Sequence, residues 1–151
     1  MKGKKILSLW NEPKSHPNKL LSDHLQRVGG LCQNNLSSKK INFTDYLDVN
    51  LLEAIAYLIG VAHDFGKSTS YFQEYLAEKD EVKKAKLKNK NETHHGFISA
   101  LFTYYIVKQY LIEKNVLNEK YNQYLPVISF LVVKRHHGNL NNILDEVIDF
   151  D

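Results

Sequence analysis

The chain has 151 residues, 43% of them apolar, which is enough to fill one hydrophobic core. Its net charge of +3 is small for a protein that coats DNA, and its single cysteine excludes an internal disulfide. We therefore expect one globular domain over residues 1–151, in a reducing, cytoplasmic setting. No apolar run is long enough for a signal peptide or a membrane span, so no membrane association is expected.

The first helix is predicted over residues 20–32, after an irregular opening that contains Pro13 and Pro17. Apolar residues recur there three or four positions apart, as they do on one face of a helix. His24 lies on or beside this apolar stripe. The stripe consists of Leu20, Leu21, Leu25, Val28 and Cys32.

The clearest helix is predicted over residues 51–65, where nearly every position is apolar. Asn50 is its expected N-cap, with Glu53 three residues later, and Gly66 is expected to end it. A helix that is apolar on all sides is buried, so this one is expected at the centre of the domain. A short helix over residues 70–79 follows, and then a lysine-rich stretch that is expected to be a mobile connection.

A fourth helix is predicted over residues 94–115, with Thr93 as its cap. A fifth is predicted over residues 121–137, with Pro126 in its first two turns, where a missing N–H is tolerated, and Gly138 at its end. Six residues of the fourth helix are expected to face the core: Phe97, Ile98, Leu101, Phe102, Tyr105 and Ile106.

The last residues, 139–151, carry an apolar helical face that needs a partner. We find no internal repeat and no alternation of strands with helices, which favours an all-α bundle. The partnerless face suggests a bundle truncated at its C-terminus, that is, a fragment lacking its last helices. This face consists of Leu140, Ile143, Leu144, Val147 and Ile148.

The seven histidines are informative because most of them are bunched near predicted helix ends. Buried imidazoles are costly unless each finds a partner, and a shared metal ion satisfies several at once. His63 and Asp64 close an apolar helix, where a buried carboxylate needs a cation or several donors. This pair therefore predicts a metal site. An adjacent histidine pair taken alone has the alternative of being an exposed polar pair at a helix end.

Four motifs follow one another along the chain: His24, VAHDFGK at residues 61–67, HGFISA at residues 95–100 and HHG at residues 136–138. In this order they resemble the HD superfamily of metal-dependent phosphohydrolases. More narrowly, the chain is similar to the HD nuclease domain of the type I CRISPR-associated helicase-nuclease. The resemblance covers residues 20–138, most of the chain, and implies the helical fold of HD domains.

The resemblance implies a centre for two metal ions that are bridged by Asp64, with His24 and His63 on the first ion. Asp64 and Lys67 are then the catalytic residues, and Lys67 lies close to the bound phosphate. The ligands implied for the second ion are His95, His136 and His137.

His94 competes with His95 for the ligand role, but only His95 stands four residues before Ser99, as the family pattern requires. His16 matches no family motif and precedes Pro17, which is typical of a loop residue.

One or two divalent transition-metal ions are the implied cofactors, because imidazole ligands favour Mn, Co, Ni or Fe over Mg. Such an ion lowers the pKa of water and supplies a nucleophile for hydrolysis. The resemblance points to single-stranded DNA as the substrate, with RNA as the alternative. The residues expected to contact nucleic acid are Lys67, Ser99, Lys83, Lys84, Lys86 and Lys88.

The implied partners are a helicase, fused or separate, and a CRISPR RNA-guided surveillance complex. Two departures from the family stand out: Gly96 replaces a frequent serine, and the aspartate that completes the first metal site lies well beyond HHG in the family. Two alternatives follow, an HD-type nucleotide phosphohydrolase and a catalytically incomplete metal-binding helical module. The aspartates that follow HHG here are expected to be too near to it in sequence for that role: Asp145, Asp149 and Asp151.

Overall fold

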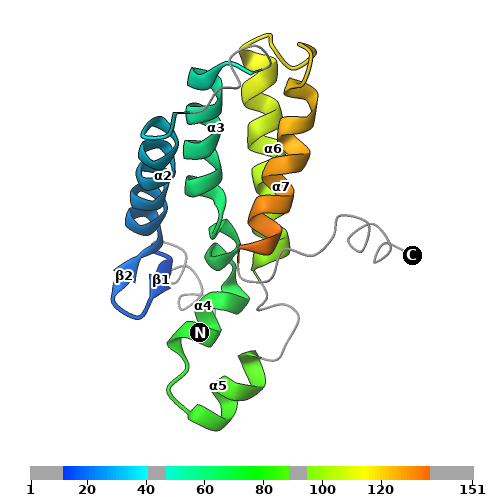
Figure 1. Cartoon of the computed structure of the whole chain (residues 1–151). Helices are drawn as coiled ribbons and strands as arrows, with labels where there is room; N and C mark the ends of the chain where they lie inside the picture. The colour runs from blue at the N-terminus through cyan, green and yellow to red at the C-terminus, as the bar shows by residue number, and fades with distance from the viewer. Residues whose placement is uncertain (1–11, 41–46, 89–94, 137–151) are drawn as a thin grey trace, which may run out of the picture.

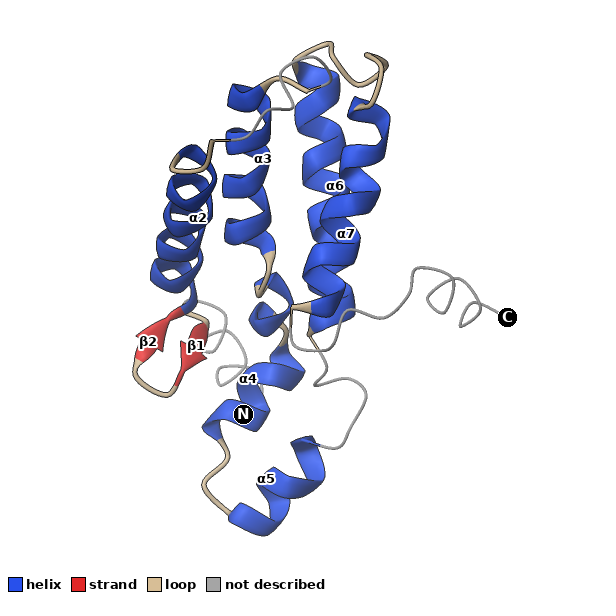
Figure 2. Ribbon diagram, viewed as in Figure 1, coloured by secondary structure: helices blue, strands red, loops and turns tan. Residues whose placement is uncertain are grey.

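The structure is a computed structural model and describes residues 12–40, 47–88 and 95–136. The described part of the chain is helical apart from one small hairpin (Figure 2). The hairpin strands are β1 (Lys14–His16) and β2 (Lys19–Leu20), and the 3-10 helices are η1 (Phe65–Ser68) and η3 (Asn122–Tyr124). The α-helices are α2 (Leu21–Ser37), α3 (Val49–Ala62), α4 (Ser70–Ala77), α5 (Glu81–Lys88), α6 (Gly96–Glu113) and α7 (Leu125–Arg135).

Four helices, α2, α3, α6 and α7, stand side by side as a bundle, while α4, α5 and the hairpin lie at its lower end (Figure 1). The start of α2, the end of α3, the start of α6 and the end of α7 meet at this lower end. The core cluster sits between the helices and is formed by Ile55, Val107, Leu111 and Leu125. The predicted all-α bundle is confirmed.

Two glycines let α2 and α3 approach each other closely. A Cβ on Gly60 would lie 2.6 Å from the Cα of Gly29, and a Cβ on Gly29 would lie 2.6 Å from a methyl carbon of Val61. Side chains at either position would push the helices apart. This contact fixes the position of His24 on α2 relative to the end of α3.

The central helix α3 begins and ends earlier than predicted. Asp48 is its N-cap and accepts a 2.7 Å hydrogen bond from the backbone N–H of Asn50, so the prediction of Asn50 as the cap was wrong. The helix ends at Ala62, and Gly66 lies within the 3-10 helix that follows. An aspartate two residues before the expected cap competes successfully because its side chain is also a strong N-cap.

The lysine-rich stretch contains a helix, α5, where a mobile connection was expected. The Asp80 carboxylate accepts the backbone N–H groups of Val82 and Lys83, at 2.9 and 3.1 Å. Lysine is a good helix former, and this cap satisfies the first amides, so the segment forms a helix although none of its residues is buried.

The inward face of α6 differs from the prediction. Phe97, Ile98, Leu101 and Tyr105 are all more than 40% exposed, whereas Phe102 and Ile106 are half-buried. The face turned to the core consists largely of small residues, which permit close packing. Since α6 carries apolar residues all round, apolar spacing alone does not identify this face. These buried residues are Ser99, Ala100, Thr103, Val107 and Leu111.

The helix predicted over residues 121–137 is divided into η3 and α7, with Pro126 in the first turn of α7. His95 is the N-cap residue of α6, while Thr93 and Gly138, predicted to begin one helix and to end the other, lie outside the described residues. The predicted helical face within residues 139–151 also lies outside them. None of the helices in the described ranges has the length and apolar character needed to cross a bilayer.

Candidate metal centre

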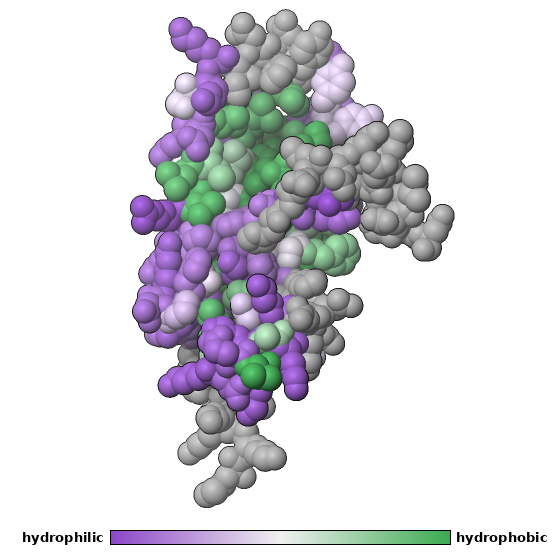
Figure 3. All heavy atoms as spheres, turned by 60° about the horizontal axis from the view of Figure 1, so that its bottom comes forward, coloured by the Kyte–Doolittle hydropathy of each residue, from purple (hydrophilic) through white to green (hydrophobic). Residues whose placement is uncertain are grey.

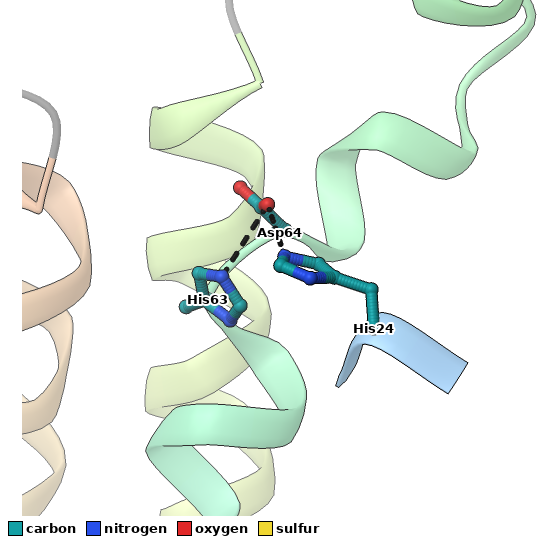
Figure 4. A group of neighbouring side chains, drawn as sticks. All are labelled: His24, His63 and Asp64. Atoms are coloured by element: carbon teal, nitrogen blue, oxygen red, sulfur yellow. Dashed lines mark hydrogen bonds and ion pairs between the residues drawn. The ribbon is translucent and has the colours of Figure 1, made fainter. Parts of the chain in front are cut away.

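Asp64 follows the last turn of α3 and is buried, with 2% of its surface exposed. One of its oxygens, Oδ2, lies 3.1 Å from His24 Nε2 and 3.3 Å from His63 Nε2 (Figure 4). The same oxygen lies 2.7 Å from the Lys67 ammonium. Helix α2, the end of α3 and η1 therefore each bring one basic side chain to Oδ2.

The other oxygen of Asp64, Oδ1, faces the opposite pair of helices. It lies 3.1 Å from His95 Nε2 and 3.3 Å from His136 Nε2. His95 is the N-cap residue of α6 and His136 is the C-cap residue of α7. The single carboxylate thus stands between two pairs of imidazoles.

The turn after Asp64 is held against α6. The backbone N–H of Gly66 donates a 2.9 Å hydrogen bond to the Ser99 hydroxyl, and the N–H of Lys67 donates to the Asp64 carbonyl at 2.9 Å. A Cβ at Gly66 would clash with the backbone and Cβ of His95. Glycine at this position therefore lets the two ligand-bearing segments come together.

Backbone carbonyls orient two of the imidazoles. His63 Nδ1 donates to the Gly60 carbonyl at 2.7 Å, and His136 Nδ1 donates to the Val133 carbonyl at 2.6 Å. A carbonyl can only accept, so Nδ1 carries the proton in both rings. In both rings Nε2 faces Asp64: with a proton on Nε2 the ring donates to the carboxylate, and without that proton Nε2 is the atom that a metal ion would bind.

The charges of the centre shift three pKa values. Burial alone would raise the pKa of Asp64, but hydrogen bonds from His136, His63, His95 and Lys67 outweigh it and hold that pKa far below its usual range. Burial lowers the pKa of His24. For His136 the effect of burial is overcome by its bonds to Asp64 and to the Val133 carbonyl, which raise the pKa.

The residues fit two adjacent metal ions. His24, His63 and Asp64 form one group of donor atoms, and Asp64, His95 and His136 form the other, with the atoms of each group within 4.8 Å of one another. Two imidazole nitrogens and a carboxylate oxygen are ligands typical of divalent transition metals. Because Asp64 belongs to both groups, it would be a ligand shared by the two sites.

Five of the residues predicted for the metal centre converge here, whereas His137 lies outside the described residues, as does the competing His94. Ser99 does not fit the contact with nucleic acid expected for it, because it is fully buried and its hydroxyl accepts the Gly66 N–H. Ser99 lies on α6 and contacts the turn that follows Asp64. The residues that converge are His24, His63, Asp64, His95 and His136, with Lys67 beside them.

The lysines predicted to guide nucleic acid lie on α5, which is separated by α4 from the lower end of α3 (Figure 1). Three are exposed and the fourth, Lys84, is half-buried, with its ammonium 6.0 Å from the centre of the Tyr75 ring. The exposed ones are Lys83, Lys86 and Lys88.

Two residues near the centre were not predicted. The ring of His16 lies edge-on to that of His24, with their centroids 5.8 Å apart. The Gln73 amide donates to the Lys67 carbonyl at 2.7 Å and is 7% exposed. Sequence spacing does not reveal either, because the contacts join segments that lie on different elements.

A family model described as "Cas3, HD domain" matches residues 12–147 of the chain. The match includes the five converging residues and the hairpin. No curated protein and no solved structure matches the chain.

Proposed function

The chain belongs to the family of Cas3 HD domains, and on this basis we propose that it is a metal-dependent nuclease that hydrolyses phosphodiester bonds of single-stranded DNA in CRISPR interference. The observation that carries this proposal is the position of Asp64 between two pairs of histidine Nε2 atoms, each within 3.3 Å of one carboxylate oxygen. Within the described ranges, no other set of side chains forms a comparable group of metal-binding atoms.

In this proposal His24 and His63 hold one metal ion, His95 and His136 hold the other, and Asp64 bridges them. A divalent ion bound there supplies the charge that lowers the pKa of water and offsets the negative charge of the phosphate. The chain's own part is to fix the ligands: Nδ1 of His63 and of His136 is held by a carbonyl, which turns Nε2 of each ring toward Asp64. Imidazole-rich ligation favours Mn, Co, Ni or Fe over Mg.

Lys67 is proposed to bind the scissile phosphate. Its ammonium is 2.7 Å from Asp64 Oδ2 and its side chain is 9% exposed, so it reaches the centre from within the protein. An anion held between the two ligand groups would lie within reach of this cation. A fixed positive charge there stabilises the additional negative charge that develops on the phosphate in the transition state.

The wider context is also part of the proposal. The α5 lysines would guide the polyanionic strand by charge, without reading its sequence. The partners proposed are a helicase, as a subunit or a fused domain, and a CRISPR RNA-guided surveillance complex that delivers the strand, in the cytoplasm. The partners and the cellular setting are proposed from the family. Binding without sequence reading is proposed from the excess of lysine over arginine, since bidentate reading of bases chiefly uses arginine.

The test is cleavage of labelled single-stranded DNA by metal-stripped protein that is resupplied with Mn, Co, Ni, Fe or Mg. We expect cutting with transition metals, none with Asp64→Ala, and unchanged cutting with Asp23→Ala, which removes an exposed carboxylate next to His24 in the sequence. Hydrolysis of nucleotides without cutting of DNA or RNA would instead indicate a nucleotide phosphohydrolase. Metal that raises the melting temperature without any turnover would indicate a binding module.

A further inference from the structure

Two side chains of the β1–β2 hairpin, Lys14 and His16, are exposed, and Lys19 is half-buried. Ser15, in the middle of β1, is buried, while Lys14 and His16 on either side of it are exposed. The Ser15 hydroxyl donates to the Lys19 carbonyl on β2 at 3.4 Å and contacts His16 Nδ1 at 3.2 Å. The hairpin therefore keeps His16 and Lys19 next to each other at its tip.

A buried glutamine fixes the hairpin to the metal centre. Gln73 accepts the backbone N–H of Lys14 at 3.0 Å and donates to the Lys14 carbonyl at 2.8 Å, as an added strand would. The same amide nitrogen donates to the Lys67 carbonyl at 2.7 Å. The N–H of Leu21, the first residue of α2, donates to the Pro13 carbonyl at 2.8 Å. The position of the hairpin is thus set by the residues that set the centre.

The tip of the hairpin lies beside His24. The ring of His16 is nearly perpendicular to that of His24, with their centroids 5.8 Å apart, and His16 is exposed, so part of its ring is accessible for stacking. Lys19 is close enough for its charge to act on the His24 imidazole. Figure 3 brings this end of the molecule forward, and the surface visible there is mostly hydrophilic.

We propose that the hairpin binds the nucleotide that flanks the cut on the His24 side, with its base stacked on His16 and its phosphate contacted by Lys19. An aromatic face beside a cation is the combination with which proteins hold single-stranded nucleic acid irrespective of sequence. The inference rests on the proposed nuclease function and adds a second contact point for the strand.

The neighbouring cavity is a poorer site for a polyanion. It has a volume of about 690 Å³ and lies between the hairpin, α4 and α5. Its charged lining is balanced, since Lys14, Lys79 and Lys84 face Glu12, Glu78 and Glu81. A phosphate there would meet as many negative as positive charges, so the path over His16 and Lys19 is favoured.

The test compares four variants, His16→Ala, His16→Phe, Lys19→Ala and the control Lys39→Ala, which removes an exposed lysine just beyond the other end of α2. Binding of a labelled oligothymidine to metal-stripped protein is measured by fluorescence anisotropy at several salt concentrations. His16→Ala is expected to weaken binding at least about fivefold, and His16→Phe to restore it, because the phenyl ring also stacks. Lys19→Ala is expected to lower the slope of log affinity against log salt by about 0.7, which Lys39→Ala leaves unchanged.

Two further measurements separate stacking from other effects. With a fully abasic oligomer, His16→Ala should bind as the wild type does, while Lys19→Ala should still bind more weakly. With metal-loaded protein, His16→Ala should raise KM for the oligonucleotide but leave turnover of bis(p-nitrophenyl) phosphate, which has no flanking nucleotide, unchanged.

The inference is overturned if His16→Ala binds the oligothymidine as the wild type does, or if His16→Phe is as weak as His16→Ala. It is also overturned if His16→Ala lowers turnover of the small diester, since His16 would then act in the metal centre. If the wild type cleaves neither substrate, the proposed function fails, and the binding arm still decides the role of the hairpin. A wild type that does not bind the oligomer overturns the inference, while cleavage by the metal-loaded protein still decides the proposed function.

Discussion

The backbone N–H of Gly66 donates a 2.9 Å hydrogen bond to the hydroxyl of Ser99, and both residues are buried. Gly66 comes two residues after Asp64, and Ser99 lies in the first turn of α6, one turn beyond His95. A Cβ on Gly66 would lie 2.9 Å from the Cβ of His95. This hydrogen bond therefore holds the turn after Asp64 against the start of α6. The lack of a side chain at Gly66 allows the two segments to come this close.

Ser99→Ala is expected to reduce the free energy of unfolding by about 1–3 kcal/mol, because the Gly66 N–H would be buried without an acceptor. Urea unfolding of the metal-stripped protein measures the change. The matched control is Ser129→Ala, since Ser129 is also buried but donates only to the Leu125 carbonyl of its own helix, at 2.7 Å. That carbonyl remains in the helix, so a smaller loss is expected. Equal losses in the two variants would contradict the role given to Ser99.

The bunching of histidines near predicted helix ends indicated a metal site, and the family resemblance supplied the set of ligands. Apolar spacing placed His24 near the start of one helix and Asp64 at the end of another, and the family motifs added His95 and His136. Antiparallel neighbours in a bundle bring alternate ends together, so residues at those ends meet. This relation is a property of topology and could be inferred without coordinates.

The orientation of α6 and the hairpin could not be predicted in the same way. Helix α6 is apolar on nearly every side, so periodicity does not distinguish its core face from the exposed face that carries Leu101 and Tyr105. The hairpin strands have only three and two residues, too few for a strand pattern. The hairpin depends on Gln73, which is 59 residues away from Lys14, and such a contact leaves no mark on local spacing.

Removal of single histidines is expected to reduce the number of bound metal ions from two to one. His24→Ala disrupts the group on Oδ2 of Asp64, and His136→Ala disrupts the group on Oδ1, while Asp64→Ala disrupts both. Elemental analysis of dialysed protein gives the number of ions per chain. His16→Ala serves as the control because His16 is outside both groups. Loss of both ions in each single variant would show one shared site instead of two.

Lys67→Met is expected to separate catalysis from metal binding. The ammonium contacts Asp64 Oδ2 at 2.7 Å, so it competes with a cation for that oxygen, and its removal should leave metal affinity unchanged or higher. Cleavage should fall by about 10²–10³-fold if the ammonium stabilises the phosphate in the transition state. Lys67→Arg, which keeps the charge, should recover part of the rate. Metal titration and single-turnover cleavage measure the two effects, and weaker metal binding in Lys67→Met would contradict this account.

The metal-free protein should show opposite pH effects for two of its histidines. The pKa of His136 is raised by its hydrogen bond to Asp64 and the Val133 carbonyl, which outweigh burial, so its protonated form stabilises the fold. This stabilisation is fully present below the unfolded pKa of about 6.5 and is lost as the pH rises through the folded pKa. Burial lowers the pKa of His24, so its stabilisation is present above about pH 6.5 and is lost as the pH falls.

Urea unfolding of wild type, His136→Gln and His24→Gln between about pH 5 and 8 would measure these effects, since 6.5 is the unfolded pKa of histidine. The loss of stability in His136→Gln should be larger at the acid end of this range, because the wild type gains there from protonation of His136. The loss in His24→Gln should be larger at the alkaline end, where the wild type keeps its neutral imidazole. Glutamine titrates in neither state, so each difference reports the histidine alone. Parallel pH profiles for the two variants would show that His24 and His136 have the same electrostatic environment, against the asymmetry around Asp64 described above.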